Sequence, residues 1–295
     1  MSQSLPVSYV QVVGVERITP RMARVTFTGD ALADLIEDRP DQQMKLCFPK
    51  GRGAPVLPEQ DADDTYGMRW YEAYLAIPEA DRPWMRSFTV RAYDRERNEM
   101  TVDFVLHGDT GPATRWGRTA RPGDVLGMVG PSSAYARPLP ASDWLLLAGD
   151  ATALPAIGTL LEALPAGMRA VAYVAVVDAA EEQRLSFAAE VTVRWVHAGE
   201  ELTDVVRAAE LPGEARAGAA WLAGESGTVR ALRRHLVEER GMPRSAVEFS
   251  GYWRLRLTQD DAPTEEDLAW AKERAEEGCE LLSVCCTEVS GGERE

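Results

Sequence analysis

The chain has 295 residues, of which 45% are hydrophobic and 27% charged, a composition typical of globular proteins and sufficient for two cores. Its 47 Asp and Glu residues outnumber 32 Lys and Arg residues, and the net charge of −15 disfavours nucleic acid or an anionic membrane as a partner. No apolar run is long enough to span a bilayer and no secretion signal opens the chain, so we expect a cytoplasmic protein. The four cysteines predict neither a disulfide framework nor a metal site.

The first half of the chain alternates short β-rich runs with turns. Two such runs lie within residues 9–28 on either side of Thr19 and Pro20, which predicts a hairpin. Further elements are predicted as follows: strands at residues 42–48, 86–91, 100–107 and 125–129, a helix at about 113–120, a helical turn or loop at 30–36 and a charged turn at 93–99. This pattern indicates a small antiparallel Greek-key barrel with one inserted helix.

The sequence RSFTVR at residues 86–91 has the alternation of a strand with two different faces. Phe88 and Val90 lie on one face, and the other carries Ser87, Thr89 and Arg91. A strand of this kind suits a flat, anionic ligand, because Arg86 can fork onto a phosphate, Phe88 can stack on a ring and Thr89 can hydrogen-bond the ring edge. The alternative is an ordinary strand with a polar outward face.

A second candidate site follows the predicted strand at residues 100–107. Gly111 permits a close backbone approach and Pro112 favours the start of a helix. The unpaired amides of the first helical turn, with Ala113 and the Thr114 hydroxyl, form an anion site. Two phosphate-binding elements this near in sequence suggest a dinucleotide such as FAD.

The second half of the chain changes to alternating strands and helices, which predicts a parallel, doubly wound sheet with ligands at the carboxyl ends of its strands. The apolar run at residues 144–148 suits a strand buried on both faces. The turn that follows it can hold a pyrophosphate through its amides, although it lacks the Gly-x-Gly-x-x-Gly fingerprint; it contains Gly149, Asp150, Ala151 and Thr152. We therefore expect three parts: a barrel domain at 1–140, an α/β domain at 141–258 and an acidic, helical C-terminal extension at 259–295.

Five motifs occur in one order along the chain: RSFTVR, DFVLHGDTGPATRWGRTARPGDVLGMVGPSS, LLLAGDATALPAI, WLAGES and SGYWR. This series resembles the siderophore-interacting protein family over residues 10–254. The resemblance implies an FAD-dependent ferric-siderophore reductase, built like the ferredoxin-reductase superfamily, with an FAD-binding barrel and an NAD(P)H-binding α/β domain. Electrons would pass from NAD(P)H to FAD and then singly to Fe(III) in the siderophore, with release of iron in the cytoplasm.

The resemblance also implies roles for individual residues. The FAD contacts are Arg86, Ser87, Phe88, Thr89, Arg91, His107, Gly111, Pro112, Ala113 and Thr114. Thr89 and His107 lie closest to the flavin and are the catalytic candidates. NAD(P)H would contact residues 149–152 and also Gly224 and Glu225. Lys45 matches a basic residue that faces the siderophore in the family, and Arg137, Arg254 or Arg256 could supply the other cations where this sequence departs from the family.

Several of these positions have ordinary alternatives or depart from the family pattern. His107 can equally be a structural histidine, and Lys45 a solvated strand lysine. Ser132 stands where some relatives have an arginine, and Arg256 stands where the family has a glycine. The identity of the siderophore therefore cannot be predicted.

The sequence also leaves the donor and the acceptor open. NADH is favoured over NADPH because relatives with a C-terminal extension prefer it, and ferredoxin is a further possible donor. We expect a monomer. The rival interpretations are a flavin reductase of the same architecture with a protein or free flavin as acceptor, and a siderophore-binding module without turnover.

Overall fold

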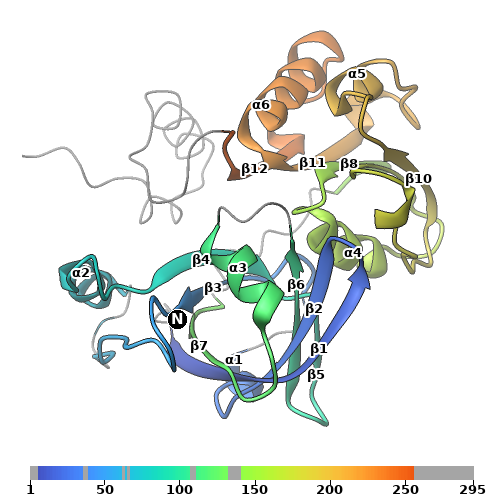
Figure 1. The fold of residues 1–295 in the computed structure, drawn as a ribbon. Coiled ribbons are helices and arrows are strands. Elements are labelled where there is room, and N and C mark those ends of the chain that lie inside the picture. Colours follow the sequence, from blue (N-terminus) through green and yellow to red (C-terminus); the bar gives the residue numbers. More distant parts are fainter. Residues whose placement is uncertain are drawn as a thin grey trace, which may run out of the picture.

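A computed structural model of the chain describes residues 6–35, 39–61, 64, 67–106, 111–131 and 141–255, which form two β-sheets (Figure 1). Four residues discussed above (His107, Ser132, Arg137 and Arg256) and the C-terminal extension lie outside the described residues. The part of the chain that is described contains no helix long and apolar enough to cross a membrane.

The N-terminal sheet has seven antiparallel strands in the order β4-β3-β7-β1-β2-β6-β5. The strands are β1 (Val7–Thr19), β2 (Met22–Thr28), β3 (Gln43–Phe48), β4 (Trp84–Thr89), β5 (Ala92–Asp94), β6 (Glu99–Val105) and β7 (Val125–Val129). The sheet curls so that its two sides approach each other. Just beyond the edge strand β4, the Arg91 amide donates to the Thr101 carbonyl on β6, near the opposite edge, at 2.9 Å. The predicted antiparallel barrel is therefore confirmed, together with its inserted helix α3 (Pro112–Thr119).

Aromatic side chains fill the interior of the barrel beneath α3. The Phe88 and Phe104 rings lie 4.6 Å apart between their centroids, and Trp116 of α3 stacks on Phe27 with centroids 6.0 Å apart. The helix can approach β6 closely because residue 117 is a glycine; a Cβ there would lie 3.2 Å from side-chain atoms of Phe104 and Leu106. The aromatic core thus fixes α3 and its N-terminus on the barrel.

The C-terminal sheet has five parallel strands in the order β10-β9-β8-β11-β12. These are β8 (Trp144–Asp150), β9 (Arg169–Ala175), β10 (Glu190–Val196), β11 (Gly218–Glu225) and β12 (Val247–Trp253). Helix α4 (Leu154–Ala163) packs on one face, and α5 (Leu202–Arg207) and α6 (Ser226–Arg234) pack on the other. Short helical turns complete the domain: η2 (Ala179–Glu181), η3 (Ala215–Ala217), η4 (His235–Glu239) and η5 (Arg244–Ala246). The predicted doubly wound sheet is confirmed, with β8 buried as expected.

The structure contains elements that the sequence pattern did not predict. Helix α2 (Met68–Ala76) follows the left-handed Gly67, and the Asp64 carboxylate accepts from the Trp70 amide at 2.8 Å. This helix covers the outer side of β3, where burial raises the pKa of the Cys47 thiol to about 12 and keeps it protonated. Residues 30–36 contain the short helix α1 (Leu32–Leu35), and the expected charged turn at 93–99 begins with the strand β5.

The two sheets contact each other through α4 and through the β1–β2 hairpin, and Figure 1 shows α4 between the parallel sheet and the strand ends of the barrel. Arg91 makes a two-pronged ion pair with Glu162 of α4, with N–O distances of 2.6 and 3.0 Å. At the hairpin, the Thr19 hydroxyl donates to the buried Glu181 carboxylate at 2.5 Å. These contacts hold the barrel in one orientation against the parallel sheet.

We predict that Asp103→Ala lowers the free energy of unfolding by about 3 kcal/mol, because it leaves the Arg24 guanidinium without its carboxylate partner. The two residues face each other on β6 and β2 and share hydrogen bonds of 2.7 and 2.8 Å, and the Asp103 side chain is only 1% exposed. Urea unfolding followed by circular dichroism measures the change. The control Arg97→Ala breaks an exposed pair with Glu99 and should have little effect. Equal, small losses in both variants would contradict the prediction.

Candidate functional site

Strand β4, which carries the RSFTVR sequence, pairs with β3 so that predicted site residues face one another. Lys45 lies opposite Ser87, and its ammonium donates to the Ser87 hydroxyl at 3.3 Å. Gln43 lies opposite the buried Thr89, and its side-chain amide donates to the Tyr252 hydroxyl at 3.5 Å. The candidate substrate contact, the candidate catalytic threonine and the last motif of the chain are therefore brought to one place.

Phe88 and Arg86 lie on the other face of β4. The Phe88 ring packs against Phe104 and Phe48 of the barrel core but remains partly exposed. Arg86 is half-buried, and one of its guanidinium nitrogens donates to the Met85 carbonyl at 2.9 Å. The Phe88 ring and the Arg86 guanidinium therefore both lie at the rim of the barrel. Stacking of Phe88 on a flavin and binding of phosphate by Arg86 stay predictions.

Helix α3 presents its N-terminus at the same end of the barrel. Gly111 is the N-cap residue and has an extended backbone; it offers no side chain to cap the helix, which begins at Pro112. The buried Thr114 hydroxyl donates to the Val105 carbonyl at 3.3 Å, which anchors this turn to β6. Since amides at a helix start have no acceptor within the helix, this turn fits a phosphate group.

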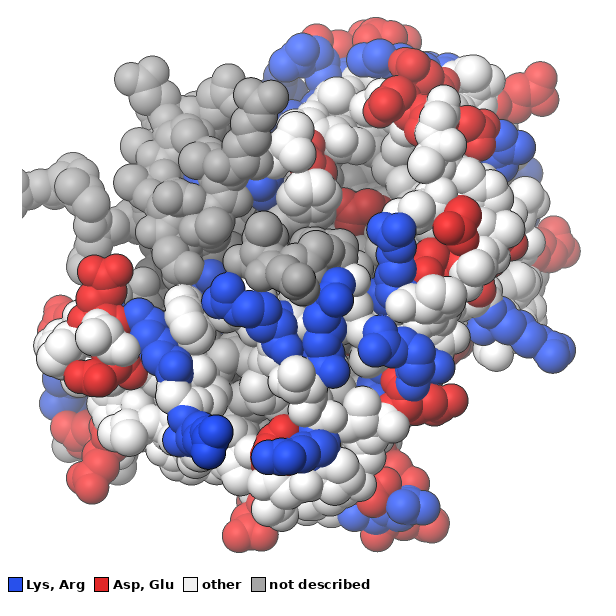
Figure 2. Space-filling view, viewed as in Figure 1, with Lys and Arg blue, Asp and Glu red and all other residues white. Residues whose placement is uncertain are grey.

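Further cations surround this part of the barrel. The Trp84 ring lies between the Lys50 ammonium, at 5.2 Å from its centroid, and the Arg115 guanidinium, at 5.8 Å. Figure 2 shows Lys and Arg side chains concentrated on the barrel face that carries α3 and β4, whereas Asp and Glu side chains lie mainly around the periphery. An acidic chain thus keeps a locally basic face, and the donor set there suits the pyrophosphate of FAD.

The structure gives Arg91 a contact that the sequence did not indicate. Its guanidinium holds Glu162 and lies against Gly158 of α4, where a Cβ would come within 3.3 Å of it. This arginine therefore joins β4 to the α/β domain; because β4 is predicted to contact the flavin, it is called the flavin strand below. Direct contact between Arg91 and a cofactor stays a prediction.

The carboxyl ends of β8, β11 and β12 meet at the Asp150 carboxylate. Its Oδ1 accepts from the Thr152 amide and hydroxyl, at 2.8 and 2.5 Å. Its Oδ2 accepts from the Glu225 amide at 2.9 Å and from the Trp253 indole N–H at 2.8 Å. The two turns predicted to bind NAD(P)H are therefore adjacent, and Arg254, which follows Trp253, lies at the same edge of the sheet. Asp150 itself is committed to joining these turns.

Two glycines make this arrangement possible. A Cβ at Gly149 would lie 2.5 Å from the Ala153 Cβ and 2.6 Å from the Ala223 carbonyl oxygen, and one at Gly224 (φ +132°) would lie 2.5 Å from Asp150 Oδ2. Helix α4 begins just beyond, and its N-cap Ala153 provides no side-chain hydrogen bond. The two glycines therefore let the turns and α4 pack closely together, and the amides at the start of α4 fit the pyrophosphate of a dinucleotide.

Glu225 caps the start of α6 by accepting from the Thr228 amide at 2.8 Å. Burial alone would raise the pKa of this carboxyl, but hydrogen bonds from the amides of Thr228, Gly227 and Leu255 outweigh burial and lower the pKa below its ordinary value. Glu225 is therefore ionised at neutral pH. A negative charge at this position is also favoured by the helix dipole.

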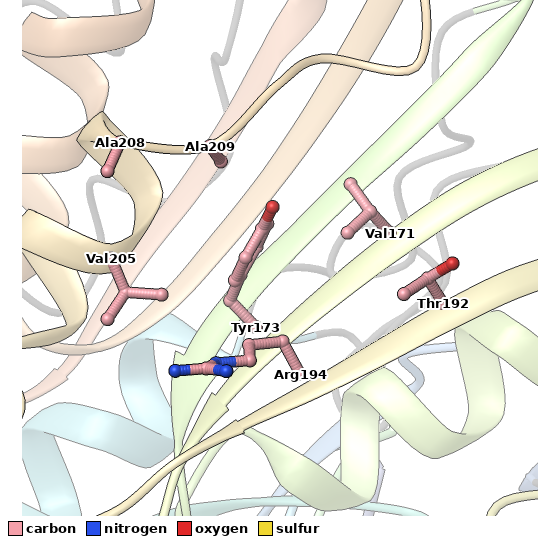
Figure 3. A pocket seen from close by; sticks show the side chains of 7 residues that line it. All are labelled: Val171, Tyr173, Thr192, Arg194, Val205, Ala208 and Ala209. Carbon is pink, nitrogen blue, oxygen red and sulfur yellow. The ribbon is translucent and has the colours of Figure 1, made fainter.

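A hollow of about 450 Å³ lies elsewhere, on β9 and β10 beside α5 (Figure 3). It is lined by Val171, Tyr173, Thr192, Arg194, Val205, Ala208 and Ala209. These residues lie on the face of the sheet opposite α4. The hollow is therefore separate from the candidate NAD(P)H site at the carboxyl ends of β8, β11 and β12, which is called the carboxyl edge below. In the described part of the chain, no group of three or more His, Cys, Asp or Glu residues is arranged to hold a metal ion.

Sequence reasoning missed the residues that bring the two halves of the site together. Asp41 and Gln43 precede and begin β3, and Trp221 of β11 donates its indole N–H to the Asp41 carboxylate at 3.0 Å. Asp41 has a positive φ of 52°, which Asp tolerates better than most residues. The sequence carried one weak signal, a Pro40–Asp41 turn directly before a strand.

Comparison with known proteins agrees with this geometry. Residues 11–135 match the model of the siderophore-interacting FAD-binding domain, and residues 142–256 match that of the siderophore-interacting protein. The chain belongs to the siderophore-interacting protein family. A siderophore utilization protein of T. fusca, solved as a crystal structure, is 34% identical with a TM-score of 0.75, over 87% of this chain and 96% of that one.

Two relatives in the family carry names that state an activity. The ferric vibriobactin reductase of Vibrio cholerae is 30% identical over 85% of this chain and 95% of its own length. The NADPH-dependent ferric-chelate reductase of Escherichia coli is 29% identical over 83% of this chain and 92% of its own length. The resemblance inferred from the five motifs is therefore confirmed at the level of the family and its fold.

We predict that Glu225→Gln destabilises the protein by about 1 kcal/mol at pH 7, in the range of a lost helix cap. Because the folded pKa is lowered, the charged form contributes stability above the unfolded pKa of about 4.3, and this is lost as pH falls through the lower, folded pKa. The difference in unfolding free energy between wild type and variant should hold from pH 8 to about 5 and shrink below about 4. Urea titrations across this range measure it; a difference that grows as pH falls would contradict it.

Proposed function

We propose that this chain is a flavin-dependent reductase that passes electrons from NAD(P)H through FAD to Fe(III) held in a siderophore, and so releases iron in the cytoplasm. One observation carries the proposal: Gln43, paired with Thr89 of the flavin strand, contacts Tyr252 at the carboxyl edge of the parallel sheet. Two candidate dinucleotide sites on different sheets thus open toward each other. Electron transfer between two cofactors requires this arrangement.

The barrel residues would hold FAD at its pyrophosphate and at its flavin ring. Arg86 and the first amides of α3, with Thr114, suit the pyrophosphate, and the exposed part of Phe88 suits the flavin ring. Thr89 lies beside Gln43, where its hydroxyl can hydrogen-bond the ring edge. FAD, when bound, supplies the chemistry that amino-acid side chains lack: it accepts an electron pair and releases electrons singly.

The parallel sheet would hold NAD(P)H along its carboxyl edge. The pyrophosphate suits the turn of residues 149–152 at the start of α4, where Gly149 lets β8, β11 and the start of α4 pack closely. The nicotinamide half suits the adjacent Gly224 and Glu225, because Tyr252 and the flavin strand lie on that side. Asp150 holds these turns together through four hydrogen bonds, and its contact with the cofactor stays a prediction.

The ferric siderophore would bind at the mouth between Lys45 and Arg254. Lys45 projects beside Ser87 on the outer face of the barrel, next to the flavin strand. Local cations matter here, because the chain carries a net charge of −15 and would otherwise repel an anionic siderophore. The role of His107 rests on the family resemblance alone, and Arg137 is a substitute for a family arginine that this sequence lacks; both lie outside the described residues.

The rival functions differ in the acceptor. A flavin reductase would pass electrons to free flavin or a protein, and a binding module would hold siderophore without turnover. A module of the second kind has no need for a flavin strand aimed at a dinucleotide edge, so the geometry favours an enzyme. The relatives named as ferric reductases support iron as the final acceptor.

Trapping of Fe(II) with a chromogenic chelator tests the proposal. The purified, FAD-loaded protein is supplied with NADH or NADPH and, in turn, a ferric siderophore, free flavin or a redox protein under anaerobic conditions. We expect donor-dependent Fe(II) formation that is faster with the ferric siderophore than electron transfer to the other acceptors. Donor oxidation with free flavin or a protein but without Fe(II) formation would favour the first rival, and siderophore binding without turnover the second.

We predict that Arg86→Ala yields a folded but colourless protein, because the pyrophosphate loses its forked partner. The flavin-to-protein ratio from absorbance measures the effect, and far-ultraviolet circular dichroism checks the fold. The control Arg82→Ala alters an arginine in the loop before β4 and should leave the ratio unchanged. An Arg86→Ala protein that still purified yellow would show that the phosphate role is wrong.

We predict that Lys45→Glu raises the KM for an anionic ferric siderophore by about tenfold, in line with reversal of a charge near the ligand. NADH oxidation with a neutral acceptor should change little. The control is Arg69→Glu on α2, which replaces an exposed arginine paired with Asp61 and for which a smaller effect is expected. Steady-state kinetics with both acceptors measure the change; an equal loss with both would indicate that Lys45 has a structural role.

A further inference from the structure

Two polar atoms at the junction of β3 and the flavin strand make no hydrogen bond within the described part of the chain. They are the Thr89 hydroxyl and the side-chain carbonyl oxygen of Gln43, Oε1. The two residues are partners across the strands, and such partners hold their Cβ atoms about 4.5–5.5 Å apart. Thr89 is only 7% exposed, and polar groups on buried residues normally have a partner. These two atoms therefore suit a ligand that lies against the strand pair.

Neighbouring side chains decide which end of the Gln43 carboxamide is available. Its Nε2 donates to Asp41 Oδ1 at 3.2 Å and to the Tyr252 hydroxyl at 3.5 Å. A carboxylate only accepts hydrogen bonds, so the end of Gln43 that faces Asp41 must be the NH2 group. Asp41 is held in turn, because its Oδ2 accepts from the Trp221 indole and its amide donates to the Thr159 hydroxyl, each at 3.0 Å. Gln43 Oε1 is thus fixed as an acceptor.

A fixed acceptor distinguishes the two redox states of a flavin. Oxidised flavin has a lone pair at its N5 atom, whereas reduced flavin has an N–H there. The Thr89 hydroxyl can donate or accept and so serves both states, but Gln43 Oε1 can only accept. An oxygen of this kind gains a hydrogen bond from the reduced ring and faces a lone pair on the oxidised one.

We infer that Gln43 contacts the flavin through Oε1 and stabilises its reduced form, and that Asp41 is the positioning residue that keeps this oxygen turned toward the ring. The inference rests on the proposed function, because it assumes that FAD binds with its ring edge at Thr89. Stabilisation of reduced flavin favours electron uptake from the nicotinamide, whose candidate site lies on the Tyr252 side of Gln43.

The midpoint potential of the bound flavin tests the inference, because reference dyes report it without nicotinamide or siderophore. Gln43→Met keeps the approximate length of the side chain and removes the carboxamide. We expect this variant to lower the equilibrium preference for reduced flavin by about tenfold, the upper end of what one hydrogen bond contributes. For a two-electron couple, this change lowers the potential by about 30 mV.

Asp41→Asn tests the positioning role without altering Gln43. Because Trp221 donates its indole N–H, the Asn oxygen must accept from it, and the Asn NH2 group then faces Gln43. The Gln43 carboxamide turns its oxygen toward that group and its own NH2 toward the ring. The potential should therefore fall at least as far as in Gln43→Met.

The control is Thr159→Val, which removes the hydrogen bond between α4 and the Asp41 amide but keeps the shape of the side chain. It loosens the same domain contact and should leave the potential unchanged. An unchanged potential in Gln43→Met would overturn the inference and leave Gln43 as a link between the domains. An equal fall in Thr159→Val would also overturn it, since a looser domain contact would then explain every change.

Circular dichroism and the flavin-to-protein ratio establish that each variant is folded and loaded. These two measurements also separate the inference from the proposed function. A folded wild-type protein that bound no FAD would refute the proposed function and the inference together. A wild-type protein that bound FAD and reduced a ferric siderophore, with variants of unchanged potential, would refute the inference alone.

Discussion

Asp41 joins the antiparallel barrel to the α/β domain through its hydrogen bonds with Thr159 and Trp221. Its amide donates to the Thr159 hydroxyl of α4 at 3.0 Å, and its carboxylate accepts from the Trp221 indole at 3.0 Å and from Gln43 at 3.2 Å. Gln43 begins β3, the strand that pairs with the flavin strand β4. The position of one loop residue therefore sets where the flavin strand lies relative to the carboxyl edge of the other sheet. Rates of electron transfer depend on such positioning, because reacting groups must be held in close, fixed geometry.

Acids at the interface and at the strand ends serve the same purpose. Asp150 accepts four hydrogen bonds and fixes three strand ends of the parallel sheet, while Glu181 and Glu162 hold the hairpin and β4. The buried Glu181 accepts from the Thr19 hydroxyl and the Arg21 amide, so its burial is compensated, whereas Asp150 is half-buried and Glu162 is exposed. Acidic residues thus build the frame. Lys and Arg side chains gather on the barrel face that carries α3 and β4 (Figure 2), and such a face suits phosphates and an anionic substrate.

Local patterns in the sequence predicted what depends on neighbours along the chain. The alternation in RSFTVR put Phe88 and Val90 on one face of the strand, and that face packs on the barrel core; the apolar run after Asp143 marked the central strand β8. The glycines at 149 and 224 marked turns that the structure shows to be adjacent. Repeating patterns and turn residues carry this information because they reflect burial and backbone conformation directly.

Contacts between distant parts of the chain could not be predicted in this way. Asp41 and Trp221 are separated by 180 residues, and Arg91 and Glu162 by 71, so no spacing rule connects them. The sequence consequently suggested a cofactor contact for Arg91 and gave no role to Asp41 or Gln43. Helix α2 was missed for a related reason. It begins where the Asp64 carboxylate accepts from the Trp70 amide and is stabilised by aromatic packing on β3, neither of which follows a helical repeat.

Electron transfer from NAD(P)H through FAD to a ferric siderophore can be followed in the visible absorption spectrum of the purified protein, before and after anaerobic addition of NADH or NADPH. We expect a flavin band that the nicotinamide bleaches and that recovers when a ferric siderophore is added. A flavin band that neither nicotinamide bleaches would contradict the role of the parallel sheet and point to another donor, such as ferredoxin. A protein without a flavin band, even after incubation with FAD, would contradict the reductase account as a whole.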